Sequence, residues 1–519
     1  MKKASSVVGA AGIIALLTLC SRFMGLVRKL AQSWAMSDGA VAGTYDTANT
    51  VPNVLFEVAA GGALAGAVIP IVSRFIARKL QTEESQTVSA LITWILTVSI
   101  PLAFLVIVCA QPIIGFLVGD APEAQIALGT SLLRMFALQI PLYGLSVVFS
   151  GVLQAHKLFV LPALAPLLSS IIVIGVFVWY ALAVGPNIAP VEVTSGAVAL
   201  LGWGTTAGVV IFSLVQLPAV IKLVNIRLTW RFRPGLGRET VRLGGAGLAA
   251  LFAQQFALIC VMYSTNALSD AGTFAAFNYA YAIFMVPYAV LAVPIATAVF
   301  PRISEACELG DTQKVQNLVC RSTYLVFVMG TVAAVLIATL SVPAKTVVEL
   351  GNPIIGLDIA LQSMALGAIG FSILYHGARV LYALGRPQLV VLSNSIAWFT
   401  VVLFLLAGYA IGIHGREMTL LWVGIALSMG MTTGVVAIVV ALRRASGARR
   451  VLGDRRSLTL ALGVVGVAGT VAWFVVPAVQ KTCGNGIGGA FIAACVGAVI
   501  VLGPVLALLG KDIKKKVLS

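Results

Sequence analysis

Hydrophobic residues in this chain fall into long, nearly uninterrupted blocks that are separated by short polar segments. Each block is about twenty residues or longer, and an α-helix of that length crosses the hydrocarbon core of a membrane, which is about 30 Å thick. The pattern therefore predicts an all-α polytopic membrane protein with fourteen transmembrane helices. The predicted spans cover residues 7–27, 46–73, 87–118, 123–155, 158–184, 195–221, 243–268, 273–301, 315–342, 356–384, 388–412, 418–442, 457–479 and 486–510.

The composition supports a membrane protein. Of the 519 residues, 60% are hydrophobic and only 10% are charged, whereas soluble domains carry about 25% charged residues. The mean hydropathy is +1.03. The first apolar stretch follows Lys2 and Lys3 and so resembles a signal peptide, but no small-residue cleavage site follows it. We therefore expect this stretch to be retained as the first span.

The distribution of positive charge predicts the topology. The formal net charge is +16, and the cations cluster in every second loop. If the N-terminus lies inside, the outer loops hold only Lys345, Arg416 and Lys481. The positive-inside rule then predicts that both termini are cytoplasmic. We expect the basic inner loops to contact anionic membrane lipids, and this placement of charge argues against nucleic-acid binding.

An internal repeat divides the chain. Three short words recur in order at an offset of about 230 residues, which corresponds to six spans. An even number of spans gives both copies the same orientation, which is a parallel pseudo-repeat. The paired words are Ala67–Ser73 with Ala298–Ser304, Gln86–Val88 with Gln313–Val315, and Val152–Ala155 with Val380–Ala383.

The repeat predicts four parts of the chain. Residues 1–222 form an N-terminal six-helix lobe, 223–242 a basic cytoplasmic linker, and 243–445 a C-terminal six-helix lobe. Residues 446–519 form two extra helices and a basic cytoplasmic tail. Two lobes related in this way enclose a central cleft, and we expect transport by alternating access.

Three cations lie at the outer end of the first span, namely Arg22, Arg28 and Lys29. A charge at the centre of a membrane helix costs about 2.5–3.5 kcal/mol on insertion scales and usually faces a wet cavity. Arg22 and Lys29 are two helical turns apart and share a face, and the planar guanidinium group suits phosphate. We expect these residues to bind an anion. The alternative is snorkelling to the outer surface, which the positive-inside bias disfavours.

Other charged residues lie within or near the spans. Glu57 is an intramembrane carboxylate that could pair with an arginine of the first helix or titrate and couple transport to protons. Arg134 lies about eleven residues into the fourth predicted span and is a further candidate for substrate binding. Asp46 is expected to be a carboxylate of an outer loop, and the alternative is that it pairs or titrates as Glu57 does, nearer the outer surface.

Uncharged polar groups at depth are candidate ion ligands. Gln254 and Gln255 in the seventh span and Asn394 in the eleventh could bind Na⁺ through oxygen atoms. The alternative is that they form hydrogen bonds between helices. Sodium ions or protons are thus the candidate coupling ions, and we expect no other cofactor.

The second span combines a proline with glycines. Pro52, Gly61 and Gly62 form a candidate hinge, because proline removes a backbone hydrogen bond and glycine allows bending. The alternative is that proline and glycine are simply common in transmembrane helices.

The sequence carries no motif of a known enzyme or metal site. The three histidines are scattered, the seven cysteines include no CxxC pair, and there is no Walker A, HExxH or GxSxG motif. We therefore expect neither catalysis nor a bound metal. A membrane enzyme acting on a lipid-linked sugar would need a catalytic group in an outer loop, and these short loops offer none.

The motifs of the first two spans resemble those of the MurJ (MviN) family, lipid II flippases of the multidrug/oligosaccharidyl-lipid/polysaccharide exporter superfamily. The matching residues are Ser21-Arg22-x-x-Gly25-x-x-Arg28, Val51-Pro52-Asn53-x-Leu55, and Gly62-Ala63-Leu64 leading to Ile69-Pro70. The resemblance implies transport of the undecaprenyl-pyrophosphate-linked disaccharide-pentapeptide from the inner to the outer leaflet of a bacterial plasma membrane. It also implies cavity arginines at Arg22 and Arg28, a lipid-tail groove on the last two helices, and the cell-wall synthesis machinery as a partner.

The chain departs from the family pattern at two places. Many members have an arginine pair where this chain has Phe56 and Glu57, and Asp-Arg where it has Tyr281 and Ala282. The Phe-Glu form looks like the actinobacterial branch, and Lys29 or Arg134 would have to replace the missing cavity charge. The alternative functions are a flippase for another polyprenyl-linked glycan and a multidrug exporter, which a cationic cleft disfavours.

Overall fold

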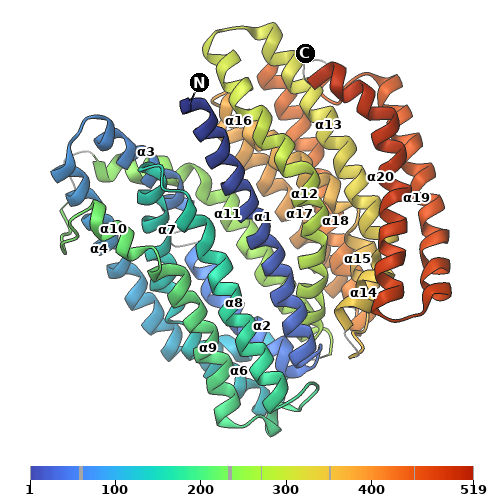
Figure 1. Ribbon diagram of the computed structural model, residues 1–519. Helices are drawn as coiled ribbons and strands as arrows, with labels where there is room; N and C mark the ends of the chain where they lie inside the picture. The colour runs from blue at the N-terminus through green and yellow to red at the C-terminus, as the bar shows by residue number, and fades with distance from the viewer. Residues whose placement is uncertain are drawn as a thin grey trace. The chain divides into compact units, whose positions relative to one another are not determined.

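The computed structural model describes residues 2–57, 62–231, 236–270, 272–349, 352–448 and 450–517. Its regular structure in these ranges consists of α-helices and one short 3₁₀ turn (Figure 1), so the predicted all-α fold is confirmed. The chain divides into two compact units, residues Met1–Gln255 and Phe256–Ser519. This boundary falls inside helix α11 (Leu236–Ala267). The four-part division predicted above stays a prediction.

The helices follow the predicted hydrophobic blocks. The first unit contains α1 (Lys2–Met36), α2 (Ala40–Phe56), α3 (Gly62–Ala77), α4 (Gln81–Val108), α5 (Ala110–Val118), α6 (Glu123–Phe136), α7 (Gln139–Ala155), α8 (Val160–Ala183), the 3₁₀ turn η2 (Pro190–Glu192), α9 (Ser195–Leu214) and α10 (Leu217–Leu223). The second contains α12 (Thr273–Glu308), α13 (Thr312–Thr339), α14 (Ser341–Glu349), α15 (Leu357–Met364), α16 (Gly367–Ala383), α17 (Pro387–Ala410), α18 (Arg416–Ser446), α19 (Arg455–Cys483) and α20 (Ile487–Val517).

Eleven of the fourteen predicted spans are recovered as helices long and apolar enough to cross a membrane. Ten pass this test in the described residues, and the pair α15 and α16, bent by 49°, makes the eleventh. The other three predicted spans, residues 7–27, 46–73 and 243–268, each include side chains outside the described set. The count of fourteen therefore stays a prediction, while a multi-pass membrane protein is established.

Helix α7 is central to the first unit, where it contacts α3, α4 and α9. Its buried residues Val148, Phe149 and Val152 belong to one apolar cluster with residues of α3, α4 and α10. Two glycines allow the close approach of its neighbours. A Cβ atom at Gly144 would lie 2.4 Å from the Ile95 side chain, and one at Gly151 would lie 2.5 Å from Val68. The two glycines thus let α3 and α4 pack closely against α7.

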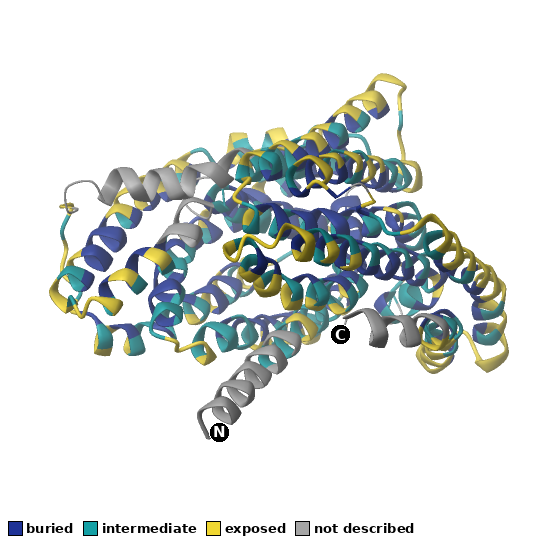
Figure 2. Cartoon of the chain, turned by 90° about the horizontal axis from the view of Figure 1, so that it is seen from above, coloured by how far each residue is buried: buried dark blue, intermediate teal, exposed yellow. Residues whose placement is uncertain are grey.

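The second unit is built around α13, which packs against α12, α16, α19 and α20. Buried residues lie on the helix faces that meet other helices, and exposed residues lie on the outer faces (Figure 2). An aromatic row runs along α12 at helical spacing, with Phe277, Tyr281 and Phe284 stacked at centroid distances of 5.7 and 6.0 Å. Phe371 of α16 packs edge-on against Phe284 at 5.5 Å.

An extended segment of residues 225–231, which we term the strap, lies along α4 in the first unit. Every second residue of the strap bonds to every fourth residue of α4. The two spacings match, because four helical residues rise about 6 Å and two extended residues about 6.6 Å. Hydroxyl oxygens of α4 accept hydrogen bonds from Asn225 N (Ser85, 3.2 Å), Arg227 N (Ser89, 3.0 Å), Thr229 N (Thr93, 3.0 Å) and Trp230 Nε1 (Thr97, 3.0 Å). The Trp94 indole N–H donates to the Trp230 carbonyl (3.0 Å).

Replacing Thr93 with valine should detach the strap. The change keeps the shape of the side chain but removes the acceptor for the Thr229 N–H, and an unmade buried hydrogen bond costs about 1–3 kcal/mol. We expect tryptic cleavage after Arg227 and Arg231 of the purified protein to accelerate by roughly tenfold.

The matched control is Thr87→Val. Thr87 is also buried on α4 and donates to the Glu83 carbonyl one turn back (2.7 Å), but it lies about 200° around the helix from Ser85 and Ser89. This control should leave the cleavage rate unchanged. Equal cleavage rates in the two variants would contradict the anchoring role of Thr93.

Candidate functional site

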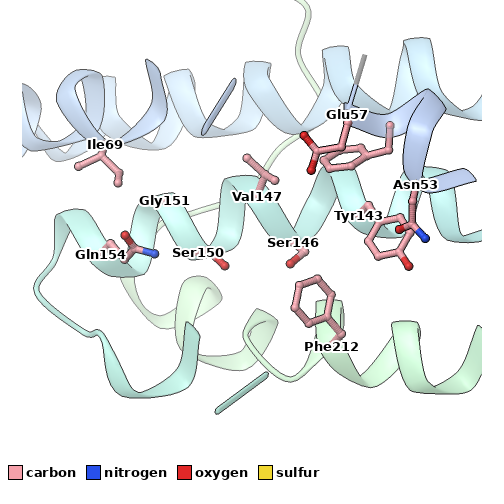
Figure 3. A pocket seen from close by; sticks show the side chains of 11 residues that line it. Asn53, Glu57, Ile69, Tyr143, Ser146, Val147, Ser150, Gly151, Gln154 and Phe212 are labelled. Atoms are coloured by element: carbon pink, nitrogen blue, oxygen red, sulfur yellow. The ribbon is translucent and has the colours of Figure 1, made fainter. Parts of the chain in front are cut away.

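A polar stripe on the otherwise apolar helix α7 marks the candidate site. Gln139, Tyr143, Ser146, Ser150 and Gln154 follow one another at intervals of three or four residues, which places them on one face of the helix. The last four of them line a cavity of about 430 Å³ within the first unit (Figure 3). A helix that buries such a stripe at membrane depth requires polar neighbours or a wet cavity.

The remaining walls of the cavity come from three other helices and the residue after α2. Asn53 and Phe56 come from α2, Ile69 from α3 and Phe212 from α9. Aromatic rings close one part of it, since Phe56 lies 5.6 Å and Phe212 lies 6.2 Å from Tyr143, measured between ring centroids. The cavity therefore combines aromatic rings with hydroxyl and amide groups, which give a ligand orientation and specificity.

The cavity holds one carboxylate, that of Glu57, which directly follows α2. The side chain is half-buried and points into the cavity across from the α7 stripe (Figure 3). Ser150 on the opposite wall donates to Gln216 Oε1 at 2.8 Å, and Tyr143 donates to Gln139 Oε1 at 3.3 Å. These bonds fix the orientation of the Tyr143 and Ser150 side chains, so this part of the site is preorganised.

Arg28 places positive charge near this cavity. Its side chain is half-buried on α1, and its guanidinium interacts electrostatically with the Tyr143 hydroxyl. Tyr143 is one of the residues that line the cavity. Arg28, the predicted cavity arginine, thus interacts with a residue of the polar stripe on α7.

The charge of Lys29 is compensated within the protein. Its ammonium group lies 3.1 Å from Asp46 Oδ1 and 2.9 Å from Gln32 Oε1, and Gln32 in turn donates to Asp46 Oδ1 at 3.0 Å. The Asp46 side chain is only 3% exposed and that of Lys29 is 22% exposed. The network ties α1 to α2. It leaves Arg22 and Arg28 as the cations of this stretch that are suited to an external anion.

The expectation that Asp46 lies in an outer loop is wrong. The residue is buried in the first half of α2, because that helix begins at Ala40, six residues before the predicted start of the span. The helix is extended by the sequence Ala40-Val-Ala-Gly-Thr-Tyr, in which the polar residues Thr44 and Tyr45 are buried. Tyr45 shares a hydrogen bond of 2.8 Å with Thr205 of α9, whereas the buried Thr44 hydroxyl has no hydrogen-bond partner among the described residues.

Two further predicted binding residues lie on the surface. Arg22 of α1 and Arg134 in the last turn of α6 are both exposed. Neither residue lines the cavity, and their exposed positions are compatible with a role in transport. Both stay predictions as binding residues.

The candidate ion ligands and the hinge residues can be placed only in part. Gln254 is half-buried and Gln255 buried in α11. Asn394 donates its amide to the Val390 carbonyl of its own helix (3.0 Å), which leaves the Asn394 carbonyl oxygen as the candidate ligand. Pro52 lies buried inside α2, Gly62 begins α3, and Gly61 lies outside the described residues.

Sequence analysis missed the α7 side of the site. Tyr143, Ser146, Ser150 and Gln154 were available as a signal, because a polar stripe at helical spacing within a hydrophobic block is unusual. Arg28 and Glu57 could be recognised singly, because a charge in an apolar block is conspicuous, whereas the residues of the α7 stripe are uncharged. Gln32, which supports Lys29 and Asp46, had no comparable pattern in the sequence.

The family of this chain follows from a comparison with known proteins. The family model described as "Lipid II flippase MurJ" matches residues 33–487. The chain belongs to the lipid II flippase MurJ family. The resemblance inferred from the motifs of the first two spans is thus confirmed, and this MurJ family is named for transport rather than for catalysis.

Individual MurJ relatives are distant. The probable lipid II flippase MurJ of Rhizobium meliloti (strain 1021) is 27% identical over 360 residues, or 66% of this chain and 62% of that relative. The lipid II flippase MurJ of Burkholderia cenocepacia is 26% identical over 336 residues, or 62% of each chain. The alignments therefore span about three fifths of the length of these curated relatives.

Solved structures share the fold. "Lipid II flippase MurJ, inward closed conformation" matches with a TM-score of 0.76 at 17% identity, over 96% of this chain and 99% of that one. An inward-facing multidrug resistance MATE family transporter of the MOP superfamily matches with a TM-score of 0.66 at 14% identity, over 83% and 98%. At these identities the likeness establishes the fold, which MurJ shares with MATE transporters.

Removing the charges of Lys29 and Asp46, singly and together, should show that the effects of the two substitutions on stability are strongly coupled. Asp46→Asn leaves the Lys29 ammonium without the charge that faces it, and Lys29→Met leaves a buried carboxylate. Removing one partner of a buried pair costs about 3–5 kcal/mol, whereas removing both is often nearly neutral. We therefore expect each single variant to lower the midpoint of thermal unfolding in detergent, and the double variant to recover most of the loss. Additive effects of the two substitutions would show that the pair does not hold the helices together.

Proposed function

We propose that this protein is a lipid II flippase that moves the undecaprenyl-pyrophosphate-linked peptidoglycan precursor from the inner to the outer leaflet. The observation that supports this proposal is the half-buried Arg28 beside a polar cavity, in a chain that belongs to the MurJ family. The curated relatives are themselves named lipid II flippases or probable lipid II flippases.

The chemistry of the site matches the two ends of such a headgroup. The pyrophosphate of this substrate is esterified by the lipid at one end and by the sugar at the other, so it carries two negative charges, and arginine binds it through parallel charge-assisted hydrogen bonds. Arg28, together with Arg22, supplies this function. A glycan presents many hydroxyl groups and apolar ring faces. The Ser146 and Ser150 hydroxyls, the Gln154 amide and the Tyr143 ring are suited to it.

We further propose transport by alternating access, which the division into two units and the repeat in the sequence support. In this proposal the units rearrange about the headgroup, and Pro52 with Gly61 and Gly62 allows the second helical segment to bend. Sodium ions bound by Gln254, Gln255 or Asn394, or protons taken up by Glu57, drive the cycle. The positive charge of the predicted inner loops supports cytoplasmic termini in a bacterial plasma membrane, and in this proposal the cell-wall synthesis machinery supplies the substrate.

Replacing Arg28 or Arg22 with alanine should abolish complementation of a flippase-depleted strain. A hydrogen bond to a charged group contributes about 1.5–3 kcal/mol, which corresponds to a loss of roughly 10- to 100-fold in substrate binding. Lipid II should then accumulate in the inner leaflet, as measured by its protection from an external modifying reagent.

The control for this experiment is Arg386→Ala, which removes an exposed cation from the loop between α16 and α17. This variant should complement fully, and membrane levels of all three proteins are compared by immunoblotting. Normal growth of the Arg28→Ala strain at wild-type protein levels would refute the role of Arg28 in binding.

Replacing Glu57 with glutamine should weaken transport or change its dependence on pH. The substitution preserves the size of the side chain and its contacts in the cavity but removes its ability to ionise. We would measure flipping in reconstituted vesicles across a range of external pH, with Glu192→Gln in the exposed turn η2 as the control. If Glu57→Gln left both the rate and the pH profile unchanged, proton coupling through this residue would be ruled out.

Two other classes of cargo remain as alternatives, and each can be distinguished from lipid II. A different polyprenyl-linked glycan would use the same pyrophosphate contacts, so competition between purified lipid-linked glycans in the vesicle assay separates it from lipid II. An organic cation would bind next to Glu57, and the MATE-like fold permits this function. Arg28 opposes it, because a cation beside the cavity repels a cationic drug.

A further inference from the structure

We propose that the strap, residues 225–231, together with the adjacent turn of α4 forms a binding site for the headgroup of an anionic phospholipid of the cytoplasmic leaflet. The site lies within the first unit and outside the cavity described above. It consists of the exposed side chains Arg227, Leu228, Trp230 and Arg231 on the strap and Trp94 on α4.

The backbone of the strap is held in a defined position at the membrane surface. Non-helical backbone exposed to lipid is tolerated only when its polar groups are satisfied within the protein. Here the N–H groups of Asn225, Arg227 and Thr229 donate to hydroxyl groups of α4. Because these N–H groups are bonded to α4, the position of the strap along that helix is fixed. The positions of its outward side chains are fixed with it, unlike those of a free loop.

The level of the strap in the membrane follows from the exposed face of α4. Exposed side chains of this helix are polar at Gln81, Thr82 and Gln86, and large apolar side chains are exposed from Trp94 onward. This change marks the boundary between headgroups and hydrocarbon. Arg227 is bonded beside Ser89, within this boundary, so its guanidinium lies at headgroup level.

The apolar side chains of the strap point to the same conclusion. Leu228 is 79% exposed, Trp230 59% and Trp94 44%. Exposure of that size is unfavourable in water but suits acyl chains, and tryptophan is enriched at membrane interfaces. The indole N–H groups of both tryptophans are already bonded within the protein. Their rings can therefore lie on the acyl side of the boundary without losing a hydrogen bond.

The charge of the strap selects an anionic headgroup. Residues 222–231 have the sequence Lys-Leu-Val-Asn-Ile-Arg-Leu-Thr-Trp-Arg, with three cations and no acidic residue. Lys222, Arg227 and Arg231 are all exposed. Arg231 starts deeper along α4 than Arg227, because the preceding Trp230 is bonded to Thr97, and its long side chain can reach back to the headgroups. Cations next to exposed leucine and tryptophan side chains match an amphipathic anion whose phosphate and acyl chains are joined, which is a phospholipid rather than a free phosphate.

Tryptophan quenching by brominated lipids tests the proposal in reconstituted vesicles of the full-length protein. Vesicles of phosphatidylcholine would carry a minor fraction of brominated phosphatidylglycerol or, for comparison, of brominated phosphatidylcholine. The fluorescence of Trp230 is obtained as the difference between the wild type and Trp230→Phe. We expect this fluorescence to be quenched more by the anionic lipid, with an enrichment on the order of tenfold from two arginines at the surface. Equal quenching by the two lipids would overturn the proposal.

Three controls make the result specific. Trp203 on α9 is 52% exposed, and its contribution, taken from Trp203→Phe, should be quenched equally by both lipids. Arg227→Gln with Arg231→Gln should abolish the selectivity at Trp230. Arg443→Gln with Arg444→Gln, which removes the same charge from exposed positions on α18 of the second unit, should preserve it.

Two outcomes of these controls would overturn the site. The first is an equal loss of selectivity in the α18 variant, which would attribute the effect to the general surface potential. The second is displacement of the brominated anionic lipid by excess glycerol 3-phosphate, which would make the strap a site for free phosphate. Each measurement is independent of transport activity, so it stands whether or not lipid II is the substrate.

Discussion

The cost of a polar group without a partner at membrane depth governs this molecule. In a lipid environment the backbone must satisfy its own hydrogen bonds, which is why the described regular structure is helical. The same requirement applies to side chains. Lys29 is matched by Asp46 and Gln32, and the hydroxyl groups of α4 are matched by the strap. In each case a residue that would oppose membrane insertion alone becomes part of a connection between segments.

This constraint separates two kinds of polar residue in the first unit. One kind is satisfied by protein, as in the network of Lys29, Gln32 and Asp46, and therefore has a structural role. The other lines a cavity, as do Glu57 and Ser146, where water or a ligand can complete the hydrogen bonds. Adjacent residues can belong to different kinds. Lys29 serves the contact of α1 with α2, whereas Arg28, one residue earlier, interacts electrostatically with Tyr143 of the cavity wall.

The sequence contained most of the information on the fold, because continuous apolar blocks have few alternatives in a membrane. It was less informative on the site, for a physical reason. Arg28 and Glu57 could be found one at a time because a charge in an apolar block is conspicuous. The pairing of Lys29 with Asp46 depends on where α2 begins and on how α1 packs against it, and a hydropathy pattern specifies neither. The strap was equally hidden, since serine and threonine within a helix commonly bond to the preceding turn, and only the register of residues 225–231 reveals their second partner.

The shared fold places the specificity of transport in a few side chains. MurJ and MATE structures both match this chain with TM-scores of 0.76 and 0.66, so the arrangement of helices is compatible with different cargoes. A fold of this kind does not determine the charge of what is carried. In the function proposed above, that choice depends on the balance between Arg28 and Glu57 around a neutral polar wall on α7. A cavity with its cation beside it and its carboxylate inside can neutralise an anionic phosphate at one end while hydrogen-bonding an uncharged glycan at the other. In that proposal, the presence of Phe56 and Glu57 where many family members carry an arginine pair leaves anion binding to α1, and the pairing of Lys29 with Asp46 limits the positive charge that the substrate encounters.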